Sequence, residues 1–176
     1  MSLRSRASLL ALAAFAATVL PAAGSAAPAS TSFRIVGYEY AFTSTVGSFA
    51  GTGAGNAGDT GAWNARVEHD PLGSSPTYVN GGDFQMATTS PAGSVDFVDG
   101  TFAYHGGTIT MLKPGAYCTN QRYRVTGILQ DVSTSTSAGG SGAFAVTLTH
   151  YRTLLFGHCI IYKARVAGSV DFTYQQ

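Results

Sequence analysis

A short motif, glycine followed by any residue and then phenylalanine, recurs four times in this chain, at residues 47–49, 82–84, 100–102 and 142–144. Each copy opens or interrupts a run of β-branched and aromatic residues. Glycine tolerates bulges and close backbone approach, whereas phenylalanine favours a pleated, half-buried surface. The alternation therefore predicts many short antiparallel strands that curve, as in a barrel or a closed sandwich.

Polar and apolar residues alternate with a period of two along most of the chain after its first 30 residues. The alternation is cleanest over residues 144–150 and 160–172. Residues 95–104 and 107–112 are expected to form a hairpin that turns at 105–107. The pattern predicts about eight strands and an all-β fold, and it indicates no helix beyond the N-terminal leader.

The N-terminus has the features of a cleaved secretory signal. Arg4 and Arg6 precede an apolar run over residues 9–20, and small residues suited to cleavage follow at 23–25 and 27–29. That run is shorter than the roughly 20 residues that cross a bilayer. We therefore expect a signal-peptide helix within residues 1–29 and a single mature domain over 30–176. The protein is expected to be secreted, or periplasmic if the cell has an outer membrane.

The charge of the mature chain is close to zero. The leader carries two of the ten basic residues and none of the nine acidic ones, which leaves a mature net charge of −1 with histidines neutral. A neutral domain has no electrostatic reason to bind nucleic acid or an anionic membrane. We predict neither partner after signal cleavage, and the oligomeric state is not predicted.

The chain has two cysteines, Cys118 and Cys159. In an oxidising compartment, an isolated pair in one exported domain is most simply a disulfide. The alternative is two buried free thiols. The pair is predicted to be bridged.

Motifs for cofactors and metals are absent or lack their context. Residues 53–58 match G-x-G-x-x-G, but Asp59, Thr60 and Gly61 follow and no helix can begin there. The four histidines show no metal-binding spacing, and bridged cysteines leave little for zinc. No G-x-S-x-G sequence is present. We predict no cofactor and no metal site.

Two polar residues interrupt apolar strand patterns. Glu39 lies within the apolar stretch 33–42, where a desolvated carboxyl would serve as a catalytic acid or base. His150 continues the face formed by Phe144, Val146 and Leu148, so it is a candidate for the lumen of a barrel. The alternatives are that Glu39 lies at a rim or pairs with an arginine, and that His150 is hydrogen-bonded at a strand end.

Aromatic residues are numerous enough to line an apolar cavity. Together with His150, the predicted ligand-binding residues are Tyr38, Tyr40, Trp63, Phe84, Phe102, Tyr104 and Tyr123. A solid core without any cavity needs the same residues, so the aromatic pattern does not separate the two cases.

One hexapeptide, Ala-Gly-Ser-Val-Asp-Phe, occurs at residues 92–97 and again at 167–172. The repeat is consistent with a duplication. Because the flanking residues do not align, local convergence on a favourable strand entry explains it equally well.

Two segments resemble dirigent proteins and the related allene oxide cyclases. Residues 100–109 are similar to the family's hairpin with a tyrosine, a glycine pair and a threonine, and residues 139–144 resemble its Gly-Gly-Thr-Gly-x-Phe segment. Tyr38-Glu39 is similar to a Tyr-Glu pair in the cyclase branch. The resemblance covers about half of the mature chain and implies a closed, antiparallel, eight-stranded β-barrel around an apolar cavity.

Proteins of that family guide or catalyse the cyclisation and coupling of hydrophobic small molecules. The resemblance therefore implies that this chain binds such a molecule and guides its isomerisation or cyclisation, with Glu39 as the catalytic group. The alternatives are a non-catalytic secreted binding or cell-surface module, and a secreted inhibitor with a filled core.

Overall fold

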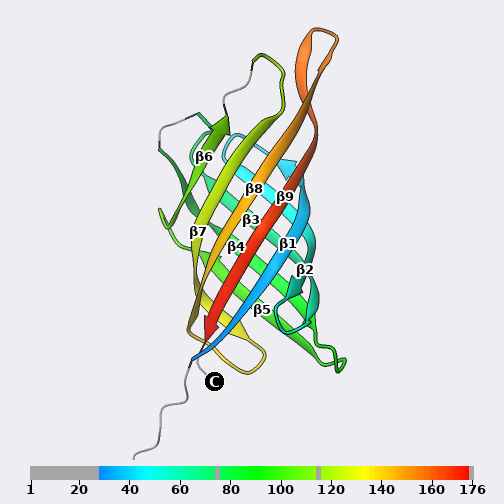
Figure 1. Cartoon of the computed structure of the whole chain (residues 1–176). Helices are drawn as coiled ribbons and strands as arrows, with labels where there is room; N and C mark the ends of the chain where they lie inside the picture. Colours follow the sequence, from blue (N-terminus) through cyan, green and yellow to red (C-terminus); the bar gives the residue numbers. More distant parts are fainter. Residues whose placement is uncertain (1–27, 74–75, 114–115, 175–176) are drawn as a thin grey trace, which may run out of the picture.

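The computed structural model describes residues 28–73, 76–113 and 116–174 (Figure 1). The predicted signal helix and both predicted cleavage segments lie outside the described residues, apart from Pro28 and Ala29. Ala29 already belongs to the first strand, where it pairs with Tyr174 of the last. The described residues contain strands and no helix, so none of them forms a helix that would cross a bilayer.

In the described residues, nine antiparallel strands form one sheet. They are β1 (Ala29–Phe42), β2 (Val46–Gly55), β3 (Thr60–His69), β4 (Thr77–Thr89), β5 (Val95–Phe102), β6 (Gly107–Lys113), β7 (Gln121–Thr134), β8 (Gly140–Leu155) and β9 (His158–Tyr174). The order is β3-β2-β1-β9-β8-β7-β5-β4, and β3 also pairs with β4, which closes the sheet. The result is an eight-stranded barrel with one extra strand, β6, between β4 and β7.

The prediction of a hairpin that turns at residues 105–107 is wrong, because β5 and β6 are collinear and point in the same direction. Strand β4 pairs with β5 through residues 83–89 and with β6 through residues 77–79, and both pairings run in the same direction. The chain bulges between the two strands at 103–106, where His105 has a φ of 54°. Backbone hydrogen bonds to Ile128 of β7 hold both sides of this bulge. An interrupted strand therefore replaces the expected reversal.

Cross-strand pairs of a glycine and an aromatic residue recur around the barrel, and several residues of the glycine-x-phenylalanine motif take part in them. Trp63 on β3 pairs with Gly51 on β2, which in turn pairs with Gly37 on β1. A Cβ on Gly51 would lie 2.8 Å from the indole Nε1 and 2.0 Å from a β1 carbonyl oxygen. Further cross-strand pairs of this kind are Phe33–Gly55, Phe84–Gly100, Gly127–Phe144 and Gly142–Phe172. Large rings fit inside a narrow barrel because their neighbours have no side chains.

The connections fall into two groups at opposite ends of the barrel. One end carries the β1–β2, β3–β4, β6–β7 and β8–β9 connections, and the disulfide between Cys118 and Cys159 joins the last two of these. We call it the disulfide end. The opposite end carries the β2–β3, β4–β5 and β7–β8 turns. Both ends of the described chain also lie there, together at the bottom of Figure 1.

A carboxylate organises one turn at the opposite end. Asp96 of β5 accepts hydrogen bonds from the backbone N–H of Ser135 at 3.0 Å and from its hydroxyl, and also from the N–H of Phe97. Burial raises the pKa of Asp96, but these hydrogen bonds outweigh it and hold the pKa below its ordinary value. The carboxylate thus stabilises the turn between β7 and β8.

Candidate functional site

The barrel encloses an apolar cavity of about 60 Å³. Its walls come from all nine described strands and are mostly aliphatic and aromatic, with Ile35, Trp63, Phe84, Phe102, Phe144 and Val166 among them. The polar side chains in the lining are Glu39, Thr43, His69 and His150. An apolar chamber with few polar groups is the usual form of a small-molecule site.

Glu39 and His150 meet inside the barrel. His150 Nε2 lies 2.9 Å from Glu39 Oε2, and each side chain is only 4% exposed. The two residues come from β1 and β8, which are separated by β9. Ala164 of β9 pairs with His150, and the neighbouring Arg165 pairs with Tyr38. A small residue at position 164 leaves the space across which the carboxylate and the imidazole reach one another.

Aromatic rings hold the imidazole on two sides. Phe42 stacks on His150 with 6.1 Å between ring centroids, and Tyr123 packs edge-on at 5.5 Å. Phe42 reaches this position because a bulge between Glu39 and Ala41 changes the alternation of β1. The imidazole is therefore fixed in orientation by packing as well as by the carboxylate.

Gly47 makes room for the carboxylate. A Cβ at this position would lie 2.7 Å from Glu39 Oε1 and 2.6 Å from Phe49 Cζ, both closer than contacts that real side chains make. The first copy of the glycine-x-phenylalanine motif thus shapes the site itself. The sequence motif signalled curvature, but its contact with Glu39 was not apparent from the pattern.

Tyr123 adds a second polar group beside the imidazole. Its hydroxyl donates a hydrogen bond to Gln121 Oε1 at 2.8 Å. Burial raises the pKa of Tyr123 above its ordinary value, with a smaller lowering by the Arg152 guanidinium and a raising by Glu39. The phenol stays protonated at neutral pH and acts as a hydrogen-bond donor.

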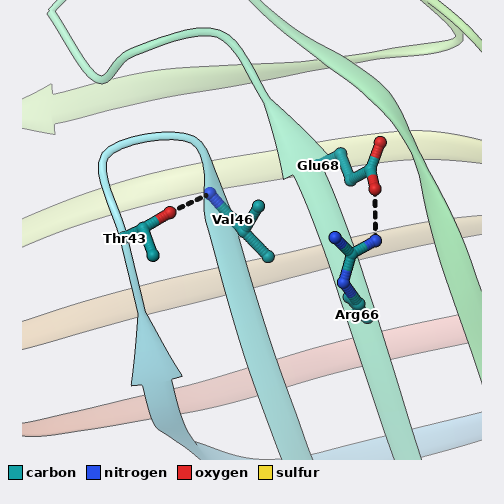
Figure 2. A network of polar contacts seen from close by, with 4 residues as sticks. All are labelled: Thr43, Val46, Arg66 and Glu68. Carbon is teal, nitrogen blue, oxygen red and sulfur yellow. Dashed lines mark hydrogen bonds and ion pairs between the residues drawn. The ribbon is translucent and has the colours of Figure 1, made fainter.

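The part of the cavity nearest the disulfide end is lined by Phe42, Thr43 and Leu72. Figure 2 shows this region, where the Val46 N–H donates to Thr43 Oγ1 at 3.1 Å and closes the β1–β2 turn. On the exposed side of β3, Arg66 and Glu68 form an ion pair with each other. This pair lies outside the cavity and is exposed to solvent, unlike the pair inside.

The predicted ligand-binding residues divide between the inside and the outside of the barrel. Trp63, Phe84, Phe102 and His150 line the cavity, and Tyr123 is buried beside His150. Tyr38, Tyr40 and Tyr104 are 55%, 60% and 73% exposed, so the expectation that they line the cavity is wrong. Tyr38 alternates with the inward Glu39, Tyr40 lies in the bulge of β1, and Tyr104 lies in the break between β5 and β6.

His69 is a cavity residue that the sequence analysis did not identify. It is 8% exposed, and its Nδ1 lies 2.7 Å from the carbonyl oxygen of Asp70. The neighbouring Asp70 and Pro71 are residues typical of a loop, and they obscure the position of His69 in the sequence. The alternation of Trp63, Ala65 and Val67 continues to position 69, and that period was the signal that placed it inside.

The disulfide between Cys118 and Cys159 is confirmed, with 5.3 Å between the two Cα atoms. Among residues 28–73, 76–113 and 116–174, no group of three or more His, Cys, Asp or Glu side chains is placed to hold a metal ion. Comparison with known proteins found no matching family model, no matching curated protein and no matching solved structure.

Proposed function

We propose that this protein is a secreted barrel that binds a hydrophobic small molecule in its lumen and guides the isomerisation or cyclisation of that molecule. One observation carries the proposal: a carboxylate and an imidazole, both buried, share a hydrogen bond inside an apolar cavity. The resemblance of residues 100–109 and 139–144 to allene oxide cyclases and dirigent proteins supports the same function.

The chemistry follows from the pair. Glu39 and His150 share one proton between Oε2 and Nε2, so together they act as a base that accepts a proton and an acid that returns it. An isomerisation that moves a double bond, or a ring closure, needs only such an exchange, because the proton taken from one substrate atom is given to another. The apolar walls exclude water, which strengthens the electrostatic interactions of the Glu39–His150 pair with a bound molecule.

The size of the cavity limits the ligand. A cavity of about 60 Å³ accommodates a few water molecules, and an apolar cavity of about 150 Å³ holds benzene. A ring-sized ligand therefore requires movement of the side chains nearest the disulfide end. Phe42 and Leu72 are 52% and 38% exposed, so the proposed enlargement of the cavity is an outward rotation of these two side chains.

The experiment is native mass spectrometry of the protein purified from its own secretion host. A co-purified hydrophobic molecule identifies the ligand, which is then incubated with the protein in D₂O. Proton-transfer catalysis incorporates deuterium into the molecule, and Glu39→Gln abolishes this incorporation. Glu68→Gln is the control, because Glu68 is the only other glutamate and lies outside the cavity.

Three results separate the candidate functions. Deuterium incorporation that is equal in Glu39→Gln and in the wild type refutes the site assignment. Ligand binding without incorporation in the wild type indicates a non-catalytic binding module. The small cavity favours a second candidate, a secreted interaction module or inhibitor with a filled core, and absence of any ligand that enters the lumen supports it.

A further inference from the structure

The hairpin between β8 and β9 ends in an exposed apolar tip. Leu154, Leu155 and Phe156 are 57%, 47% and 93% exposed. The tip is a two-residue turn in which Phe156 and Gly157 have φ values of 48° and 81°. Phe156 has the highest exposure among the large hydrophobic side chains of the described residues.

Phenylalanine is a poor choice for this turn. A turn with two positive φ values favours Asn, Asp or Gly at its first position, because other side chains are strained there. The ring at position 156 makes no ring contact with another described residue that would compensate. The side chain therefore weakens the turn locally while presenting an apolar group to the surroundings, which points to a role outside the fold.

The tip extends beyond the barrel, and a disulfide anchors the hairpin near its end. In Figure 1 the hairpin extends past the other connections at the disulfide end. Cys159 pairs with Leu154 in the hairpin, and its disulfide to Cys118 ties the hairpin to the β6–β7 connection. Tyr117, next to Cys118, is 75% exposed and adds an interfacial aromatic residue near the base of the tip.

Basic side chains gather on the outer face behind the tip. Arg122 and Arg165 both pair with Thr149, so the two lie on either side of β8. Arg124 lies two residues further along β7, and Lys163 lies two residues nearer the tip on β9. All four are exposed, and no carboxylate of the described residues forms an ion pair with them.

Acidic residues are absent from this half of the three strands. The carboxylates of β7, β8 and β9 are Asp131 and Asp171, and β8 has none. Both lie towards the opposite end, where Asp171 pairs with Ala143 near the start of β8. The near-zero net charge of the mature chain thus hides a positive region next to the apolar tip.

We propose that the β8–β9 tip inserts into the surface of an anionic lipid bilayer and that the basic face behind it is attracted to the lipid headgroups. This inference is independent of the proposed function in the lumen, and it departs from the expectation of no membrane partner that net charge alone suggested. Leucine and phenylalanine side chains without polar groups match the acyl boundary, and aromatic residues favour the interface.

The dimensions fit this arrangement. Lys163 lies six residues from Gly157, which is about 20 Å along a strand, or about 15 Å in height when the strand tilts as in a barrel. Insertion of the tip by about 5–10 Å brings Lys163 within about 5–10 Å of the headgroups. That separation is comparable to the Debye length of about 8 Å at physiological ionic strength, so the attraction is felt and depends on salt.

Flotation of the mature, disulfide-bonded protein with lipid vesicles tests the proposal. We expect binding to vesicles of phosphatidylcholine mixed with phosphatidylglycerol, weaker binding to pure phosphatidylcholine, and a loss of binding as salt rises. Phe156→Asn should reduce binding roughly tenfold or more, because the buried ring is lost. The same variant should raise the thermal midpoint slightly, since asparagine suits the turn.

Two controls keep the test specific. Phe97→Asn replaces another exposed phenylalanine, on β5 at the opposite end, and should leave vesicle binding unchanged. Lys163→Gln with Arg165→Gln should remove most of the preference for phosphatidylglycerol.

Four outcomes overturn the proposal. These are no binding of the wild type to anionic vesicles, equal binding of Phe156→Asn, equally strong and tip-independent binding to a soluble sulfated polysaccharide, and a dimer that Phe156→Asn dissociates. The third identifies a polyanion as the partner, and the fourth identifies a second copy of this chain.

Discussion

The buried pair of Glu39 and His150 makes a quantitative prediction about stability. The carboxylate of Glu39 and the imidazole of His150 are hydrogen-bond partners at 2.9 Å. Burial to 4% exposure removes both groups from water, so neither can replace a lost partner with solvent. Replacing one partner leaves the other buried without it, so Glu39→Leu and His150→Leu should each destabilise by about 3–5 kcal/mol.

The double variant should behave differently. With both polar groups replaced by leucine, no unpaired group remains in the lumen, and the cost should fall to about 1 kcal/mol. The losses of the two single variants sum to about 6–10 kcal/mol, so the double-mutant cycle predicts a coupling energy of about 5 kcal/mol or more, above the usual range of about 0.5–3 kcal/mol for residues in contact. Urea unfolding of the disulfide-bonded protein at neutral pH, followed by tryptophan fluorescence of Trp63, measures all four species.

The exposed pair on β3 is a matched control. Arg66 and Glu68 have side chains that are 48% and 43% exposed, so their coupling energy should be below about 1 kcal/mol. Additive effects at positions 39 and 150, or equal coupling in the two cycles, would refute the argument that burial makes the inner pair interdependent. A stable double variant that lacks ligand turnover would show that the pair is retained for function.

Three further predictions follow from the fold. Removing the Cys118–Cys159 bridge, which spans 41 residues, should lower the free energy of unfolding by up to about 4 kcal/mol, as measured by the urea midpoint of the Cys-to-Ser pair. Gly51→Ala should prevent folding or cost more than about 3 kcal/mol, because its Cβ would lie 2.0 Å from a backbone oxygen of β1; a loss below 1 kcal/mol would contradict this close approach. The lowered pKa of Asp96 stabilises the folded state above the ordinary value of 3.8, and this contribution disappears as the pH falls through the folded-state pKa. Asp96→Asn should therefore reduce the loss of unfolding free energy on acidification from pH 7 to below 3.8. An equal loss in the variant and the wild type would exclude the proposed role of the Ser135 hydrogen bonds.

Much of the architecture was predictable because it depends on local rules. Alternation with a period of two placed Val146, Leu148 and His150 on one inward face, and the structure confirms it. The chain has only two cysteines, so a single intramolecular disulfide was possible. Glycine next to aromatic residues indicated strands that curve and approach closely, which is how Trp63 packs over Gly51.

Other features depend on neighbours that the chain order does not show. The repeated hexapeptide is the clearest example: Val95 and Phe97 in the first copy are 60% and 56% exposed, whereas Val170 and Phe172 in the second are 0% and 1% exposed. The same residues face solvent in β5 and the core in β9, because a strand's inward face is set by its register with adjacent strands. Local sequence therefore predicted a strand in both places but not which side it buries.

The candidate site shows the same division. Glu39 and His150 were each recognisable as polar residues in apolar runs, because side-chain chemistry and period are properties of a few consecutive residues. Their contact joins positions 111 residues apart across the small side chain of Ala164, and it exists only because the sheet closes with β9 between β1 and β8. Likewise, composition determined a net charge near zero, while the packing of β7, β8 and β9 decided that the positive charges gather at one end. Net charge and alternation can be read from the residues themselves. A site depends on the distances between residues that are far apart in the chain, and closure of the barrel sets those distances.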